Sequence, residues 1–377
     1  MFNMLRAIIL TLLFIPSLLF VQKISFSQEI EKSTDKEIIN IRKFWEAYIT
    51  DISRSNGLTK NDLFAKYWNK EELEMGFTDI IDDELPVYSL GDFKVLSIDK
   101  QKDGFYIIKN TTFDNATSEI NTVYAIFNIC IKKRTAGYKL YNYFQLSKPN
   151  LFHSKIGNID YYYPKNYIFN SSTAAESSDF YSKLSDIYSN NQKKPLTYIV
   201  ANSFNEANRL IGFDQSIVTS TSPYAGFSIK NQGIILSTRV DHFHELVHAV
   251  FFNKFPNSPA LFNEGIATYY GGTSGFSYSQ LTEQFKEFIT KNPKINLSDL
   301  DNLNKLLENG TNNFYILGAL LVDYAIKNGG SQKVIDLFNH SLKNQLINDD
   351  PWSAIENVLG IKKDQFDSLI KKYIKSL

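Results

Sequence analysis

The spacing of hydrophobic residues changes several times along this chain. Apolar side chains recur at three- and four-residue intervals over residues 38–52, which predicts a helix, and residues 61–68 predict a second, shorter helix. The interval then changes to two, which predicts four β-strands. These strands begin near Phe93 and continue with residues 105–113, 122–132 and 138–146. Helices followed by antiparallel strands indicate an α+β domain, which we place at residues 37–149.

The order of these elements resembles the cone-shaped fold of the nuclear-transport-factor-like (SnoaL-like) domains. The resemblance rests on element order alone, with helices first and strands after them. It implies that this domain binds a small molecule or provides a contact surface, and it assigns no residue to a site.

A different pattern begins after the turn-forming segment Lys148-Pro149-Asn150, which marks the predicted domain boundary. Short apolar runs at residues 196–200 and 233–237 predict a small sheet. Most of the remaining sequence is helical in pattern. We therefore expect a mainly helical domain with a small sheet over residues 150–377, and an α+β protein of two domains.

The N-terminus has the features of an export signal. Fifteen mostly apolar residues, 7–21, follow a single basic residue, and Ser25 and Ser27 are small residues of the kind that a signal peptidase reads. The alternative is a transmembrane anchor, but a membrane-spanning helix needs about 20 apolar residues. We therefore expect a signal peptide at residues 1–27 and a polar linker at residues 28–36. The mature protein would be exported (periplasmic, on the cell surface or secreted) and would not remain inserted in the membrane.

Composition gives no support for nucleic-acid binding and excludes an intramolecular disulfide. Lys and Arg total 40, and Asp and Glu total 40, so the net charge gives no reason to expect nucleic acid as a partner. Cys130 is the only cysteine, which excludes an intramolecular disulfide, and its apolar surroundings predict a buried, inert thiol. The oligomeric state does not follow from these patterns.

Three of the five histidines lie within seven residues, in the segment that contains His244-Glu245-Leu246-Val247-His248. Residues four apart on a helix project from the same face, so His244 and His248 could bind one zinc ion. Glu245 follows the first histidine, where its carboxylate could take a proton from the attacking water and pass it to the leaving amine. The pattern also arises by chance, in which case the two histidines are ordinary, partly buried side chains.

Two features further along the chain add to this pattern. Ser258-Pro259 predicts the start of a helix and places Glu264 in its second turn, sixteen positions after His248. If this helix packs against the first one, Glu264 could supply a third ligand. Two His and one Glu would leave the fourth zinc position open, as catalytic sites require. Tyr315 lies in a further predicted helix, and its phenol could donate a hydrogen bond to an oxyanion.

At these residues the chain resembles the gluzincin metallopeptidases (Peptidase MA-like superfamily). Residues 263–267 match an Asn-Glu-Gly-x-Ala motif, and Tyr315 begins a Tyr-x-x-Gly-Ala segment, as in the aminopeptidase branch of that group. The resemblance covers about residues 150–377. It implies that His244, His248 and Glu264 are zinc ligands. It also implies that Glu245 is the general base and that the phenol of Tyr315 stabilises the oxyanion.

The chain departs from the aminopeptidases in ways that bear on its substrate. The gap between His248 and Glu264 is a few residues shorter, and no Gly-x-Met-Glu-Asn segment, which supplies a carboxylate for the substrate's free amine, precedes the metal helix. The short strand at residues 233–237 occupies the place of an edge strand that pairs with extended substrate. We therefore expect a zinc-dependent peptidase that acts on peptides or proteins, as an endopeptidase rather than an aminopeptidase.

The alternative is a non-catalytic exported binding protein that keeps this fold, with the N-terminal domain as its ligand or partner module. His242 is two positions before His244, so on a helix it points about 200° away from the metal side, and we interpret it as structural or as near the helix start. Asp241 and Asn263 are candidates for the hydrogen bond that would orient a zinc-binding side chain. We interpret the isolated His153 and His340 as structural.

Overall fold

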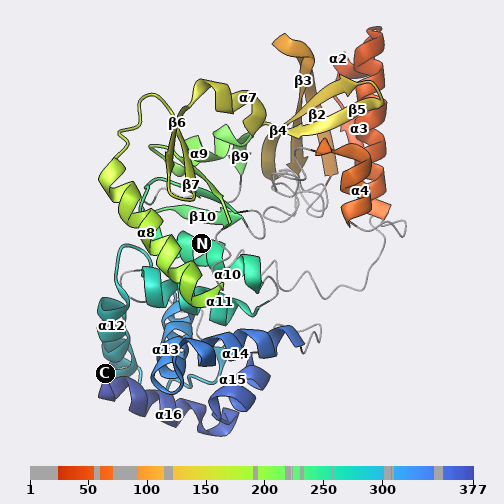
Figure 1. Cartoon of the computed structure of the whole chain (residues 1–377). Coiled ribbons are helices and arrows are strands. Elements are labelled where there is room, and N and C mark those ends of the chain that lie inside the picture. Colours follow the sequence, from red (N-terminus) through yellow and green to blue (C-terminus); the bar gives the residue numbers. More distant parts are fainter. Residues whose placement is uncertain are drawn as a thin grey trace. The chain divides into compact units, whose positions relative to one another are not determined.

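The computed structural model describes residues 24–54, 60–70, 92–113, 122–189, 194–216, 222, 224–229, 233–255, 258–300, 307, 310–343 and 351–377. The chain forms two compact units (Figure 1). The first extends to His153 and includes Tyr162–Tyr167 and Ile199–Ala225. The second consists of Ser154–Tyr161, Ile168–Tyr198 and Gly226–Leu377.

The first unit combines helices with a six-stranded sheet. Its helices are α2 (Gln28–Glu31), α3 (Lys36–Arg54), α4 (Lys60–Tyr67), α7 (Phe144–Ser147) and α9 (Phe204–Leu210). Its strands are β1 (Ile24–Phe26), β2 (Asp92–Lys100), β3 (Phe105–Phe113), β4 (Val123–Arg134), β5 (Gly137–Asn142) and β9 (Phe213–Ser216). The strand order is β1-β2-β3-β4-β5, with β9 also paired to β4, and only β1 is parallel to its neighbour.

Helix α3 lies along this sheet in Figure 1 and supplies much of the core. Its residues Ile41, Trp45 and Tyr48 are fully buried, at the helical spacing that the sequence predicts. The Phe44 ring also contacts Tyr138 of β5 at 5.9 Å between centroids. The α+β class predicted from the sequence is confirmed.

The structure differs from the sequence-based expectations in three places of this unit. The predicted fourth strand ends at Asn142 because its side-chain oxygen accepts the Phe144 amide hydrogen (2.9 Å), which turns the chain into α7. The stretch 28–36 was expected to be a linker, but it begins with α2, whose Ile30 is buried. Strand β9 lies beyond the predicted domain boundary, yet it pairs with the part of β4 that the shorter β5 does not reach.

Residues 1–23, which hold most of the predicted export signal, lie outside the described residues. The three residues after them form β1, which pairs with β2 from Ile24 to Phe26. Among the helices that the structure describes, none is both long and apolar enough to span a bilayer.

The second unit holds most of a five-stranded sheet and a group of helices. The sheet order is β10-β11-β8-β7-β6, formed by Gly226–Ile229, Ile234–Ser237, Leu196–Val200, Ile159–Tyr163 and Phe152–Ile156. The helices are α8 (Ser171–Tyr188), α10 (Phe243–Lys254), α11 (Ala260–Gly271), α12 (Tyr278–Lys291), α13 (Asn313–Lys327), α14 (Gly330–Lys343), α15 (Trp352–Leu359) and α16 (Lys363–Ser376). Strand β11 was expected at the edge, but it lies between β8 and β10, so the edge strand beside the predicted metal helix is β10.

A buried carboxylate ties three of these helices together. Asp323 of α13 accepts hydrogen bonds from Tyr278 of α12 (3.0 Å) and Tyr373 of α16 (2.9 Å). It also pairs with Lys327 at 3.1 Å. Burial, reinforced by the Asp323 charge, raises the pKa of both phenols, so they remain protonated donors.

We expect Asp323→Ala to lower the free energy of unfolding by about 2–3 kcal/mol, because two phenols would lose a charged acceptor. Urea unfolding followed by circular dichroism would measure the change. Asp336→Ala is the matched control, because Asp336 bonds only to Gln332 on an exposed helix face among the contacts described. Equal stability of the two variants would show that the Asp323 cluster does not hold these helices.

Candidate metal centre

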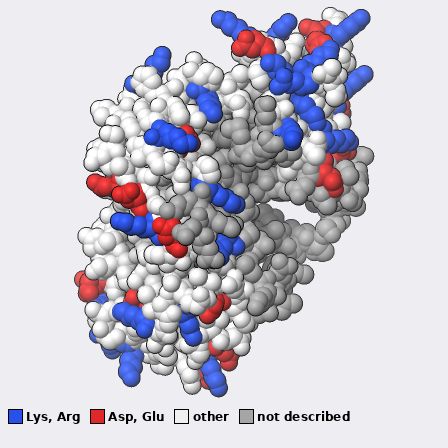
Figure 2. All heavy atoms as spheres, in the orientation of Figure 1, with Lys and Arg blue, Asp and Glu red and all other residues white. Residues whose placement is uncertain are grey.

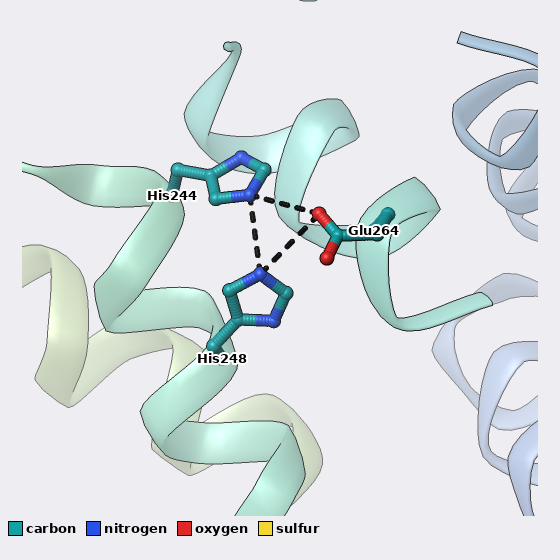
Figure 3. A group of neighbouring side chains, drawn as sticks. All are labelled: His244, His248 and Glu264. Carbon is teal, nitrogen blue, oxygen red and sulfur yellow. Dashed lines mark hydrogen bonds and ion pairs between the residues drawn. The ribbon is translucent and has the colours of Figure 1, made fainter. Parts of the chain in front are cut away.

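Helix α10 brings His244 and His248 onto one side. Most of its other residues are apolar and buried, so the helix lies inside the unit and the two histidines are only 7% and 4% exposed. The four-residue spacing places their ring centroids 4.7 Å apart. Their Nε2 atoms are 3.1 Å apart and point toward the same spot (Figure 3).

Glu264 reaches the same spot from α11. Its Oε2 lies 3.3 Å from Nε2 of His244 and 3.6 Å from Nε2 of His248. Helix α11 begins at Ala260 with Pro259 as its N-cap. Ser258 was expected to cap this helix, but its hydroxyl instead donates to the Phe255 carbonyl, because α10 ends just before it. Glu264 still falls in the second turn, where it faces α10.

The three donor atoms have the spacing that zinc requires. A tetrahedral ion with ligand bonds of about 2.0–2.1 Å holds its ligand atoms about 3.3 Å apart. The three separations in this cluster are 3.1, 3.3 and 3.6 Å. Two imidazole nitrogens that face each other at 3.1 Å also need a proton or a cation between them. The donor types and their geometry therefore fit a zinc ion.

The charges of this cluster favour a bound cation. Burial by itself would raise the pKa of Glu264, but the neighbouring His248 and His244 outweigh it and hold that pKa well below its usual range. Burial would lower the pKa of His244, but the hydrogen bond to Glu264 and the charges of Glu245 and Glu264 raise it. An ionised carboxylate thus sits where it stabilises positive charge at the two imidazoles.

A backbone carbonyl orients His244 from behind. Its Nδ1–H donates to the Gly272 carbonyl at 2.7 Å, which leaves Nε2 available for a cation. The close approach depends on Gly271, where a Cβ would lie 2.4 Å from the His244 backbone nitrogen. The sequence pattern did not point to this contact, because a carbonyl acceptor leaves no trace in residue type.

Neither residue proposed for that orienting role is the partner of His244. Asp241 is held instead by Arg239, at 2.8 and 2.6 Å. The Asn263 amide nitrogen donates to the Ser258 carbonyl, whereas its Oδ1 is buried with no hydrogen-bond partner among the described residues. In the same part of the structure, His248 Nδ1 is also buried and unpaired. Asn263 Oδ1 is an acceptor and His248 Nδ1–H would be a donor, so the two are complementary in type.

Glu245 and Tyr315 both lie close to His244. Glu245 follows His244 on α10, and only 7% of it is exposed. The Tyr315 ring, from α13, lies 6.1 Å from the His244 ring between centroids. Both residues therefore belong to the surroundings of the three donor atoms.

Helices α11 and α13 cross at a pair of glycines. A Cβ on Gly265 would lie 2.3 Å from the carbonyl carbon of Gly318, and a Cβ on Gly318 would lie 2.2 Å from the Leu261 carbonyl oxygen. Gly265 directly follows Glu264, and Gly318 is three positions after Tyr315. The crossing therefore sets the separation between the helix that carries Glu264 and the helix that carries Tyr315.

His242 lies at the helix start, as expected, and its ring lies beside Glu245, three positions later. Its backbone is non-helical (φ −81°, ψ 77°), so the helical angle of 200° does not apply to it. Its Nε2 lies 3.9 Å from Glu245 Oε1, and its ring lies 6.5 Å from the His244 ring. Burial lowers the pKa of His242 to about 4, so its imidazole is neutral.

The remaining sequence candidates lie apart from this cluster. His153 stacks on Tyr162 at 4.7 Å, and His340 contacts the Ser353 hydroxyl at 3.2 Å. Cys130 is a buried thiol on β4, as its apolar surroundings in the sequence predict.

Comparison with known proteins places few constraints on this chain. No protein-family model matches the sequence, and no curated protein matches it. The distantly similar solved structures include an M1 zinc metallopeptidase from Deinococcus radiodurans (12% identity) and a two-domain M1 zinc metallopeptidase variant bound to L-tryptophan (11% identity). Each comparison covers 74% of this chain and 62% of the solved one, with a TM-score of 0.33. This chain thus spans less than two thirds of each, and the likeness is too distant to indicate an activity.

Proposed function

We propose that this chain is a zinc-dependent peptidase that hydrolyses peptide bonds in peptide or protein substrates. The observation that carries the proposal is the convergence of His244, His248 and Glu264 at the spacing of a tetrahedral zinc site. A glutamate next to the first histidine distinguishes this cluster from a purely structural site, because a structural zinc has no use for a buried base.

A zinc ion held by these three residues would supply a Lewis acid that polarises the scissile carbonyl and makes water a better nucleophile. Glu245 accepts the proton of the attacking water and returns it to the leaving amine. Tyr315 donates a hydrogen bond to the oxyanion that forms at the carbonyl. The Gly272 carbonyl keeps the His244 ring in place throughout.

The sheet edge next to the site supports an extended substrate. Among the strands that the structure describes, β10 pairs with β11 alone, so its other side could offer backbone donors and acceptors to a peptide. Its sequence, Gly-Phe-Ser-Ile at Gly226–Ile229, contains no carboxylate that could bind a free α-amine. We therefore favour an endopeptidase over an aminopeptidase.

We propose that the protein acts after export, on substrates outside the cytoplasm, as the N-terminal sequence suggests. Figure 2 shows basic and acidic side chains interspersed over the visible face of the second unit. That distribution offers no basic patch for nucleic acid on this face.

The proposal predicts that the purified protein binds one zinc ion per chain and cleaves casein or a peptide library. A chelator should abolish cleavage, and added zinc should restore it. His248→Ala should lose the zinc, as measured by elemental analysis, because two remaining ligands cannot hold it. The ion should also dissociate on acidification, because the raised pKa of His244 lets protons compete for its ring.

His340→Ala is the matched control, since His340 lies against Ser353 and apart from the cluster. Stoichiometric zinc in His248→Ala would contradict the assigned site. Bound zinc without cleavage of any peptide would instead favour the non-catalytic alternative.

A further inference from the structure

A second group of residues, none of them a donor of the candidate metal site, lies near Glu245. Strand β10 supplies Gly226, strand β11 supplies Ser237, and the N-cap of α10 supplies His242. Gly226 and Ser237 are directly opposite each other in the pairing of the two strands. None of these residues belongs to the motifs that led to the zinc site.

The imidazole of His242 is held from two directions. Its Nδ1 lies 3.0 Å from the Ser237 hydroxyl oxygen, which also accepts the Arg239 amide hydrogen at 3.1 Å. Its backbone N–H donates to the Tyr198 hydroxyl at 3.3 Å, and that hydroxyl donates to the Arg239 carbonyl at 2.7 Å. Ser237 and Tyr198 are fully buried. The ring is thus anchored through both its side chain and its backbone.

Gly226 provides the space in which the ring and Glu245 meet. A Cβ at this position would lie 2.0 Å from His242 Nδ1, 2.3 Å from its Cε1 and 2.9 Å from Glu245 Cγ. The bare backbone of β10 therefore packs against both side chains at once. Any larger residue at position 226 would displace one of them.

The remaining edge of the ring faces the carboxylate. Nε2 of His242 lies 3.9 Å from Glu245 Oε1. A lone pair on Nε2 would face the carboxylate, so Nε2 is the nitrogen that carries a proton in this arrangement. Nδ1 then accepts the Ser237 hydroxyl hydrogen. The distance is longer than a hydrogen bond, so the contact is one between a charge and a dipole that a small rotation of Glu245 would shorten.

We propose that His242 is a positioning residue for Glu245, which it holds through Nε2–H while Ser237 fixes the ring from behind. This rests on the proposed function, in which Glu245 is the base. A carboxylate on a flexible side chain has several rotamers, and the ring restricts it to those that face the reacting water. The effect of losing this support should appear in kcat rather than in KM or in zinc binding, because His242 is not one of the three donor residues and acts through Glu245.

The test compares His242→Phe, which keeps the ring volume but removes the N–H, with His242→Gln, which restores a donor. We expect His242→Phe to keep its zinc and its KM and to lose kcat by about 10- to 100-fold, and His242→Gln to recover part of the loss. Thermal unfolding of each variant separates this effect from misfolding. His340→Phe is the matched control. Full kcat in His242→Phe, or an equal loss in the phenylalanine and glutamine variants, would overturn the proposal.

A second measurement does not depend on peptidase activity. The chain has five histidines, so ¹⁵N labelling of histidine gives few signals, and the variants assign that of His242. We expect the Nε2–H tautomer in the zinc-loaded protein and a changed signal in Glu245→Gln. An Nδ1–H tautomer, or no response to Glu245→Gln, would overturn the contact with Glu245. Failure of the wild-type protein to cleave peptides would overturn the proposed function instead.

Discussion

Glu245→Gln is expected to lower kcat/KM for peptide hydrolysis by about 10²- to 10⁴-fold, the range that general acid–base groups contribute. Glutamine has nearly the same shape as glutamate, but its amide cannot accept the proton of the attacking water. The residue is only 7% exposed, so bulk water cannot easily replace its carboxylate. Initial rates on a fluorogenic peptide, with zinc content measured on the same samples, would give the result.

The zinc content of Glu245→Gln should match that of the wild-type protein, because Glu245 is not one of the three donor residues. Glu283→Gln is a matched control, since Glu283 lies exposed on α12 and pairs only with Lys286 among the contacts described. Full activity in Glu245→Gln would remove Glu245 from the mechanism and leave the metal site untouched. Loss of zinc would show that the substitution acts on the site as a whole.

Gly318→Ala is expected to lower both stability and activity, although position 318 carries no functional group. The added Cβ would meet the Leu261 carbonyl oxygen at 2.2 Å, so α11 and α13 must move apart. Overpacking of this kind costs about 1–3 kcal/mol of unfolding free energy. Glu264 and Tyr315 would move with their helices, and a displacement of about 1 Å can cost 100-fold in rate.

Urea unfolding, zinc titration and initial rates measured on Gly318→Ala would separate these effects. Gly329→Ala is the matched control, because a Cβ there meets only the side chain of Lys333. Unchanged zinc affinity and activity in Gly318→Ala would show that the helix crossing does not set the position of Glu264. Close packing of α11 on α13 would then no longer explain why both motifs contain a glycine.

Much of the architecture followed from periodicity. A helix repeats every 3.6 residues and a strand every two, and both periods depend only on near neighbours. For this reason α3, β3 and β8 lie within two residues of the predicted ranges. Where a side chain competes with the backbone, periodicity fails: Asn142 ends β5 earlier than its apolar pattern suggested.

The same reasoning reached part of the candidate metal centre. The spacing of His244 and His248 was enough to place both rings on one side of a helix, because the relation is local. The role of Glu264 was inferred from a motif, and the structure brings its carboxylate to the two imidazoles. Which strand lies at the sheet edge was predicted incorrectly, because strand order depends on pairings between distant parts of the chain.

By itself, the sequence determined the α+β class, the local helix and strand periods, and the residue types available to bind zinc, since each of these is a property of short segments. The tertiary structure alone decided what surrounds them. It placed the Gly272 carbonyl behind His244, crossed α11 and α13 at Gly265 and Gly318, and turned His242 toward Glu245. The first two contacts involve backbone atoms and glycines, which have no side chain to reveal them in the sequence. The position of the His242 ring depends on its packing against strand β10 at Gly226, which the sequence pattern did not predict.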